Sequence, residues 1–223
     1  MESSEQISQA PKGVKKPNWI LPISLLLLVI IIDQMLKYWV KNHMILHTEK
    51  VIFKDWFYLH FIENEGMAFG MKFGDASIAK LVLTLFRLVA VGFGFYYLNV
   101  MIKKGFKNAT LICAALILAG AFGNLIDSIF YGKLFSESSF CLAQWVPWGK
   151  GYANLFYGRV VDMLYFPLIE WTLPSSTPFI GAYTIRFFEP VFNIADASIS
   201  IGVLTLLFFQ KRLLTLPKEV KTD

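Results

Sequence analysis

Asparagine and aspartate recur at one spacing in two apolar stretches of this sequence. Asn124 and Asp127 lie three residues apart, and Asn193 and Asp196 repeat the pattern, so each pair occupies one face of a helix. A third aspartate, Asp162, stands among Val, Met and Leu residues. A charged group inside hydrocarbon costs on the order of 2.5 to 3.5 kcal/mol, so these residues need a partner or a function.

Carboxyl groups held close together can carry out acid–base chemistry. They share a proton because ionising both is costly, so one can activate water while the other protonates a leaving amine. The sequence contains neither a Gly-x-Ser-x-Gly nor a His-Glu-x-x-His motif, and its three histidines lack metal-ligand spacing. We therefore expect hydrolysis by an aspartate pair, with no metal and no cofactor.

Helix capping is the alternative explanation for these residues taken singly. Asn193 suits an N-cap, and Asp196 at the third helical position would suit the positive end of the helix dipole. Capping does not explain Asp127, which falls at the negative end of its predicted helix, or Asp162 in its apolar run. The spacing alone does not decide between Asp127 and Asp162 as the partner of Asp196.

Four apolar stretches are long enough to cross about 30 Å of hydrocarbon, which needs about 20 residues. Of the 223 residues, 56% are hydrophobic and 17% are charged, which is more apolar material than one water-soluble core needs. The first stretch is expected to be a retained helix, because its apolar run is long and no small-residue cleavage site follows. The predicted spans are residues 19–40, 77–102, 109–130 and 192–209.

Lysine and arginine predict the orientation of these spans. They concentrate in the tail 1–18, the turn 103–108 and the tail 210–223. Four crossings put all three segments on one side, which the positive-inside rule makes the cytoplasm. The net charge of +5 therefore reflects membrane topology, and we expect no nucleic-acid partner. The outer loops are then 41–76 and 131–191.

The predicted fold is an all-α integral membrane protein forming a single domain over residues 1–223. Aromatic and β-branched residues in 51–73, punctuated by glycines, predict a small extracytoplasmic sheet on the membrane surface. The long second outer loop is rich in Trp, Tyr and Phe, which could be interfacial anchors or a lid for a lipid-bearing substrate. The third predicted helix ends outside and the fourth begins outside, so the carboxylates meet at the outer face.

Charged residues also occur inside the first two predicted spans. Asp33 and Lys37 are four residues apart, so they can pair on one helix face. This pair either anchors a helix end or helps to shape the site. Lys80 and Arg87 can be interpreted as one snorkelling residue and one buried partner for a carboxylate.

Five motifs, spread along the whole chain, contain most of these residues. They are Asp33-Gln34-x-x-Lys37, Asn64-Glu65-Gly66-Met67-Ala68-Phe69-Gly70, Gly123-Asn124-Leu125-Ile126-Asp127, Gly158-Arg159-Val160-Val161-Asp162 and Phe192-Asn193-Ile194-Ala195-Asp196. In this order and with four spans, they make the chain resemble the lipoprotein signal peptidases, also called type II or prolipoprotein signal peptidases.

The resemblance implies an aspartic endopeptidase of the bacterial cytoplasmic (inner) membrane, with both termini in the cytoplasm and the active site at the outer face. It would remove the signal peptide from diacylglyceryl-modified prolipoproteins, just before the lipid-bearing cysteine, and would use no metal. The expected partners are this lipid-modified substrate and membrane lipids, and the enzyme is expected to be active as a monomer.

The same resemblance assigns the site residues. It makes Asp162 and Asp196 the catalytic dyad. The dipole at the start of the fourth helix favours a charged Asp196, whereas apolar surroundings favour a protonated Asp162; we therefore expect Asp196 to be the base and Asp162 the acid. The residues expected to bind substrate or support the dyad are Asn64, Gly66, Asn124, Asp127, Asn193, Ala195, Asp33, Lys37 and Arg159.

Two departures from the family pattern affect this interpretation. The family commonly has Arg directly after the aspartate matching Asp127, whereas this chain has Ser128. Arg159 could supply the missing contact. The stretches at about 131–157 and 168–188 are also longer than the resemblance leads us to expect, so the shape of the outer loop stays open.

Two other classes of membrane protein could use buried Asp and Asn residues. A small transporter or channel subunit would carry polar residues through the full membrane depth, whereas here they gather toward the outer end. A lipid-modifying transferase would need a nucleophile or a histidine base, and neither is apparent in the sequence.

Overall fold

Four long helices form the main body of the protein in the computed structural model, which describes residues 19–54, 56–65, 76–167, 169–172, 184–187 and 190–214. All four are long and apolar enough to cross a membrane. Together with a small three-stranded sheet, they confirm the predicted combination of four helices and a sheet. The helices are α1 (Ile20–His43), α2 (Ala76–Lys103), α3 (Asn108–Ile126) and α5 (Ile194–Leu213).

The third helix extends further than the sequence predicted. After α3, the chain continues through a π-helical turn, η2 (Asp127–Tyr131), and the short α4 (Gly132–Leu134), so the apolar helical segment runs to Leu134 instead of residue 130. Asp127 directly follows the last residue of α3 and is the first residue of η2, so helical structure continues beyond it. The helix dipole does not stabilise the buried carboxylate of Asp127, so this charge needs a partner from elsewhere in the structure.

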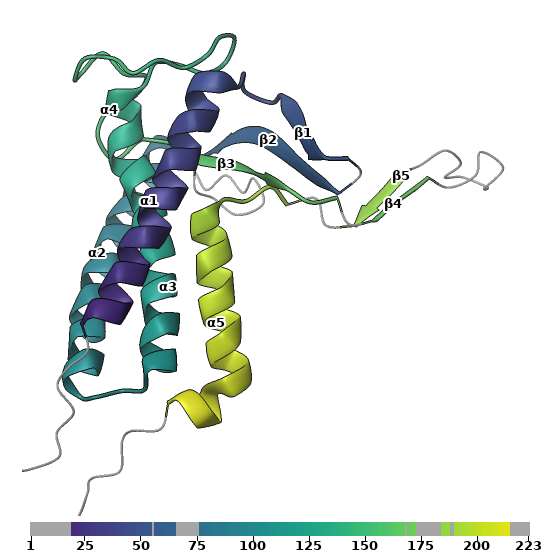
Figure 1. Ribbon diagram of the computed structural model, residues 1–223. Helices are drawn as coiled ribbons and strands as arrows, with labels where there is room; N and C mark the ends of the chain where they lie inside the picture. Colours follow the sequence, from purple (N-terminus) through teal and green to yellow (C-terminus); the bar gives the residue numbers. More distant parts are fainter. Residues whose placement is uncertain are drawn as a thin grey trace, which may run out of the picture.

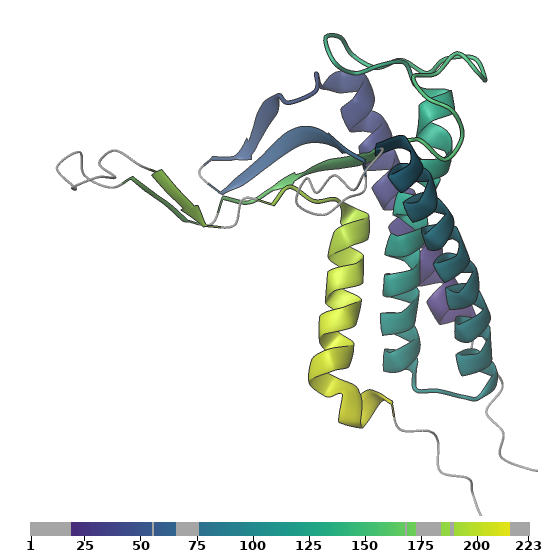
Figure 2. The same ribbon diagram turned by 180° about the vertical axis from the view of Figure 1, so that it is seen from behind.

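Small residues allow α5 to pack closely against α3, which lies between α5 and α2 (Figures 1 and 2). A Cβ added to Gly120 would lie 2.2 Å from the carbonyl oxygen of Ala195, and one added to Gly202 would lie 2.8 Å from that of Cys113. Ser198 also donates a hydrogen bond across the interface to the carbonyl of Leu116 at 3.1 Å. Close backbone approach of this kind is typical of membrane helix pairs.

The three-stranded sheet extends sideways from α1, over the end at which α5 begins (Figure 1). Its strands are antiparallel in the order β1 (Glu49–Phe53), β2 (Phe57–Asn64) and β3 (Val160–Tyr165). The sequence did not predict β3, because its buried run has no polar alternation and periodicity cannot assign such a run. Asp162 therefore lies in a strand, opposite Ile62 of β2.

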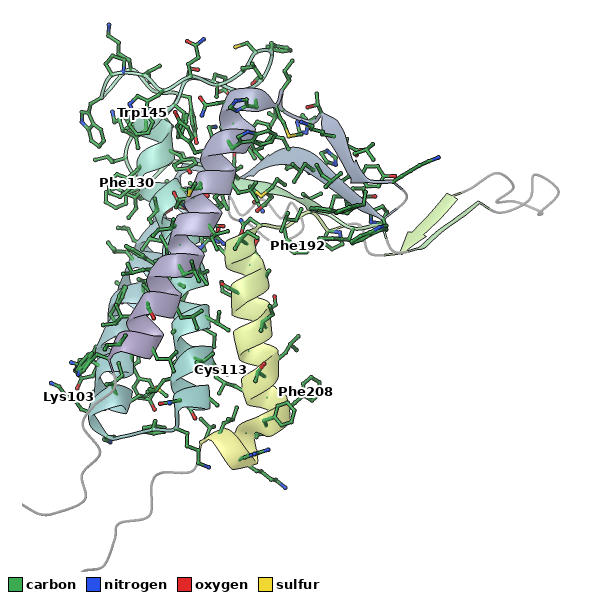
Figure 3. All side chains as sticks on the ribbon, in the orientation of Figure 1. Lys103, Cys113, Phe130, Trp145, Phe192 and Phe208 are labelled. Carbon is green, nitrogen blue, oxygen red and sulfur yellow. The ribbon has the colours of Figure 1, made fainter. Side chains whose placement is uncertain are left out.

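A second, two-stranded antiparallel sheet pairs β4 (Ile169–Thr172) with β5 (Thr184–Phe187). The loop between α4 and β3 packs against the C-terminal end of α1, where the backbone N–H of Ala143 donates to the carbonyl of Lys41 at 3.1 Å. An isolated bridge between Phe135 and Trp145 closes this loop near α4, and Figure 3 shows Trp145 beside that helix.

The apolar residues divide into a buried core and a wide outer surface. One cluster between the helices includes Leu26, Val91 and Leu118. Large side chains on the outer faces remain exposed, among them Phe208 of α5, which points away from the other helices in Figure 3. Apolar helix faces this extensive are expected in a bilayer, where lipid is the solvent. The protein is therefore a multi-pass membrane protein.

Candidate active site

A chain of side-chain hydrogen bonds joins Asp162 of β3 to Asp196 of α5. Asn193 Nδ2 donates to Asp162 Oδ1 at 2.7 Å and to Asn124 Oδ1 at 3.0 Å. Asn124 Nδ2 in turn donates to Asp196 Oδ1 at 2.7 Å. The structure thus brings both carboxyl groups and both asparagines into one cluster, although they come from three different elements.

Asn193 serves both as a helix cap and as a ligand of Asp162. Its Oδ1 accepts a hydrogen bond from the backbone N–H of Asp196 at 2.8 Å, and Asp196 Oδ2 accepts one from the Asn193 backbone at 3.4 Å. This is a capping box at the start of α5. The capping role predicted for Asn193 is therefore confirmed, and it coexists with the contact to Asp162, since the two roles use opposite ends of one amide.

Backbone pairing places β3 beside the start of α5. The Leu164 N–H donates to the Phe192 carbonyl at 2.7 Å, and the Phe192 N–H donates back to Leu164 at 3.1 Å. Phe192 marks this junction in Figure 3. Because Asp162 lies two residues before Leu164 and Asp196 lies four residues after Phe192, this short pairing sets the separation of the two carboxyl groups.

Lys37 connects α1 to the same cluster from the other side. Its Nζ contacts Asp33 Oδ2 at 2.9 Å, Asp127 Oδ2 at 2.8 Å and Asn124 Oδ1 at 2.8 Å. An ammonium group has three donors, so all three are used. The side chains of Lys37, Asp33 and Asp127 are at most 1% exposed. The Asp33–Lys37 pair predicted from the sequence is confirmed and is joined directly to Asn124, which binds Asp196.

The two aspartates bound to Lys37 hold the backbone on either side of the site. Asp33 Oδ1 accepts from the N–H of Ala195 at 2.9 Å, and Asp127 Oδ2 accepts from the N–H of Val161 at 3.2 Å. Ala195 and Val161 are the residues immediately before Asp196 and Asp162. One lysine therefore helps to position both Asp162 and Asp196, each through an aspartate and a backbone amide.

Glycine is required where these segments approach one another. A Cβ added to Gly123 would lie 2.9 Å from Asp33 Oδ2 and 3.3 Å from the Cβ of Ala195. A Cβ added to Gly158 would lie 2.1 Å from the carbonyl oxygen of Asp127. This accounts physically for the glycines in two of the five motifs.

Gln34 is a site residue that sequence reasoning did not assign, although it belongs to the first motif. Its Nε2 donates to Asp127 Oδ1 at 2.9 Å and to the Gly123 carbonyl at 3.2 Å. Its Oε1 accepts from the hydroxyl of Tyr131 at 3.2 Å. In the sequence, only its position beside Asp33 could have indicated a role for Gln34. Its partners outside α1 all come from the distant residues 123–131.

The three remaining predicted residues have three different outcomes. Asn64 Nδ2 donates to Asp162 Oδ2 at 3.4 Å, so β2 also contributes to the site. Gly66 and the rest of its motif fall outside the described residues. Arg159 binds elsewhere, because its Nη1 pairs with Glu63 at 3.0 Å and with Glu137 at 2.8 Å.

Arg159 belongs to a second buried cluster that the sequence analysis missed. Lys41, which is fully buried, pairs with Glu63 and donates to Ser138 Oγ at 3.0 Å. Burial alone would raise the pKa of Glu63, but the Lys41 charge and the hydrogen bonds from Lys41, Arg159 and Ser138 outweigh it and lower that pKa. The cluster fastens the loop before β3 to β2, next to Asn64. Lys41 lies four residues after Lys37, which was the available signal.

The environment of Asp162 favours its protonated form. Burial and the nearby charge of Asp196 raise the pKa of Asp162 to about 7, against the smaller opposing effects of Lys37 and Asn64. Among the residues that the structure describes, no group of His, Cys, Asp or Glu is arranged to hold a metal ion. Between Asp33 and Asp127, the position of a cation is taken by the ammonium of Lys37.

Comparisons with known proteins agree with this arrangement. Residues 25–211 match the family described as Signal peptidase (SPase) II. The lipoprotein signal peptidase of Porphyromonas gingivalis is 49% identical over 194 residues, covering 86% of this chain and 84% of that protein. The lipoprotein signal peptidase of Amoebophilus asiaticus is 38% identical over 189 residues, covering 83% of this chain and 75% of that protein.

A solved structure described as a bacterial membrane enzyme has the same fold. It superposes with a TM-score of 0.55 at 21% identity and covers 90% of this chain and 99% of its own. The family match spans most of the chain and includes Asp33, Lys37, Asn124, Asp127, Asp162 and Asp196. The chain therefore belongs to the signal peptidase II family of membrane proteases, which process lipoprotein precursors.

Proposed function

We propose that this protein is an intramembrane aspartic endopeptidase that cleaves diacylglyceryl-modified prolipoproteins just before the lipidated cysteine. Membership of the signal peptidase II family supports the substrate class. The observation that carries the catalytic assignment is the hydrogen-bonded chain from Asp162 through Asn193 and Asn124 to Asp196. It holds two carboxyl groups in one site, as hydrolysis by an aspartate pair requires.

Hydrogen bonding favours Asp162 over Asp127 as the partner of Asp196. Asp127 is fully buried, and its oxygens are engaged by Lys37, by the Gln34 amide and by the N–H of Val161. Such a carboxylate is a structural anion. Asp162 instead accepts hydrogen bonds from the amides of Asn193 and Asn64, and Asp196 is only partly buried. These two are the better candidates to share a water molecule.

The environments of the two aspartates support different proton roles. Asp196 lies in the first turn of α5, where the positive end of the helix dipole stabilises a carboxylate. It takes a proton from water as the water oxygen attacks the scissile carbonyl carbon. Asp162, whose pKa is raised to about 7, gives its proton to the leaving amine as the C–N bond breaks. Proton transfer from Asp196 to Asp162 then restores the starting state.

The distribution of charge supports an active site at the outer face of the bacterial cytoplasmic membrane. Lys103 lies at the opposite end of the helices from Phe192, which marks the start of α5 (Figure 3). Lys107 and Arg212 meet at that same distant end, where Lys107 Nζ donates to the Arg212 carbonyl at 2.7 Å. The positive-inside rule makes this end cytoplasmic. We infer that the enzyme acts as a monomer, because both aspartates come from one chain.

The test is cleavage of a lipidated prolipoprotein by the purified protein in detergent or lipid vesicles. Mass spectrometry should show a new amino terminus at the modified cysteine. Asp162→Asn and Asp196→Asn should each abolish cleavage while the protein stays folded. Glu49→Gln is the matched control, because it neutralises an acidic residue on the exposed strand β1. This variant should cleave normally. Normal turnover by either aspartate variant would remove that residue from the dyad.

A further inference from the structure

A polar face on α2 brings one more cation to the site. Lys80, Thr84 and Arg87 follow at i, i+4 and i+7, so they lie on the same side of an otherwise apolar helix. Arg87 Nη1 donates to Ser128 Oγ at 3.4 Å. The guanidinium is also close enough to Asp196, Asp127 and Asp162 to interact electrostatically with all three.

The cluster around the dyad carries more negative than positive charge without Arg87. If the dyad shares one proton, the carboxylates of Asp33, Asp127 and the dyad together carry three negative charges, against one positive charge on Lys37. Removing charges from water without compensation costs several kcal/mol per ion. Arg87 supplies a second positive charge to this cluster.

Three neighbouring cations bind groups outside the Asp162–Asp196 pair. Lys37 uses its three donors on Asp33, Asp127 and Asn124. Lys80 is buried rather than snorkelling, and its Nζ donates to the Glu65 carbonyl at 2.8 Å. Arg159, which the sequence offered as the missing substrate contact, pairs with Glu63 and Glu137. A guanidinium such as that of Arg87 has five donors and can bind several acceptors together.

Ser128 of η2 binds the Arg87 guanidinium. Its side chain is fully buried, and its Oγ donates to the Asn124 carbonyl at 3.0 Å while accepting from Arg87. Ser128 directly follows Asp127 in η2. Position 128 therefore lies within hydrogen-bond reach of the Arg87 guanidinium, so an arginine placed there would put its charge beside the same group.

We propose that Arg87 binds the carbonyl oxygen of the scissile peptide bond and stabilises the negative charge that develops there during cleavage. The guanidinium comes from α2 and its Nη1 donates to Ser128 of η2. The proposal rests on the proposed function. A preorganised donor of this kind acts mainly in the transition state, so its loss lowers kcat more than it changes KM.

The test removes the positive charge at position 87 by substitution and then restores a positive charge with an arginine at position 128. Arg87→Gln keeps a donor for Ser128 but removes the charge, and it should lower kcat roughly 100-fold with little change in KM. The double variant Arg87→Gln/Ser128→Arg should recover at least about tenfold of that loss. Lys103→Gln removes a charge from the exposed end of the same helix and is the matched control, with unchanged kinetics.

The outcomes separate this proposal from the proposed function. Failure of the native protein to cut a lipidated prolipoprotein would overturn the proposed function. Cleavage by the native protein together with an unchanged kcat in Arg87→Gln would overturn the role of Arg87 alone, as would a folded double variant without recovery. If Arg87→Gln does not fold, Arg87→Lys decides, because it keeps the charge: substantial residual kcat supports the proposal, and loss to background overturns it.

Discussion

The side-chain amide of Asn193 binds Asp162 at 2.7 Å through Nδ2, while its Oδ1 caps the helix on which Asp196 lies. The residue that caps the start of α5 is therefore also the residue that positions the carboxyl group of Asp162. This coupling explains how an aspartate on a strand and one on a helix can be kept in fixed relative positions. When Asn193 caps α5, its side chain is also fixed where it binds Asp162.

Asn193→Ser should separate the two roles of this residue. Serine is a good N-cap and keeps the capping contribution, while loss of the buried amide donor to Asp162 and Asn124 should lower the thermal unfolding temperature. Serine has no second amide end to reach Asp162, and misplacing a reacting group by about 1 Å can cost roughly 100-fold in rate. We expect kcat to fall by about that factor in a prolipoprotein cleavage assay.

Asn193→Ala is the companion variant, because it removes both the cap and the contact to Asp162. It should lose kcat to the same extent and should be about 1 kcal/mol less stable than Asn193→Ser, because only the alanine variant loses the cap. Equal activity in the serine variant and the native protein would mean that the contact to Asp162 does not matter for turnover.

Much of the architecture could be predicted from local patterns. Each spanning helix is a long apolar run, and a stretch such as Ile20–His43 needs no tertiary information to be recognised. The Asn193 cap was visible for the same reason. By contrast, Val160–Tyr165 is buried along almost its whole length, so it lacks the alternation that identifies a strand, and β3 was missed.

The contacts between the five motifs could not be predicted from the sequence, because they depend on packing between distant segments. The i, i+4 spacing of Asp33 and Lys37 indicated a pair, but nothing in the sequence placed Lys37 against Asn124, 87 residues away. Arg159 gives a second example. Its motif suggested a substrate contact, whereas the loop before β3 supplies Glu137 as a partner, and no sequence pattern linked those two residues.

Lys37→Met should severely destabilise the protein. It leaves the buried carboxylates of Asp33 and Asp127 without their cation, and breaking a buried ion pair by removing one partner costs about 3 to 5 kcal/mol. Thermal unfolding in detergent should show a large decrease in the midpoint. Lys104→Met, at the exposed end of α2, should leave the midpoint unchanged.

The double variant Lys37→Met/Asp127→Asn tests the cause of that loss. It removes one of the two uncompensated charges, so it should be more stable than Lys37→Met alone. If the second substitution instead adds a further loss, charge compensation is not the main role of Lys37.

Asp162→Asn should make the protein inactive but more stable at neutral and alkaline pH. The pKa of Asp162 is raised to about 7, whereas an unfolded aspartate has a pKa near 3.9. Between these values the folded protein holds a proton that the unfolded chain releases, so stability decreases as pH rises through this window and then levels off. Asparagine removes that dependence, with a gain at pH 8 of at most roughly 4 kcal/mol.

Unfolding measured from pH 5 to pH 8 checks this expectation, with the native protein and Asp162→Asn compared at each pH. The difference in their stability should grow as pH rises. The cleavage activity of the native protein should fall above about pH 7 as Asp162 loses the proton that it donates. A constant difference in stability over the whole range would contradict the protonated state of Asp162.

Glu63→Gln and Glu137→Gln should differ strongly, although both glutamates bind Arg159. The Glu63 side chain is 2% exposed and compensates the fully buried Lys41, so neutralising it should cost about 3 to 5 kcal/mol. The Glu137 side chain is 47% exposed, and a pair of that kind contributes about 1 kcal/mol or less. The lowered pKa of Glu63 means that its stabilisation is present above the pKa of an unfolded glutamate and is lost as pH falls through the folded value. The two variants should therefore converge in unfolding experiments on acidification, and equal losses at pH 7 would show that Arg159, not Lys41, is the main partner of Glu63.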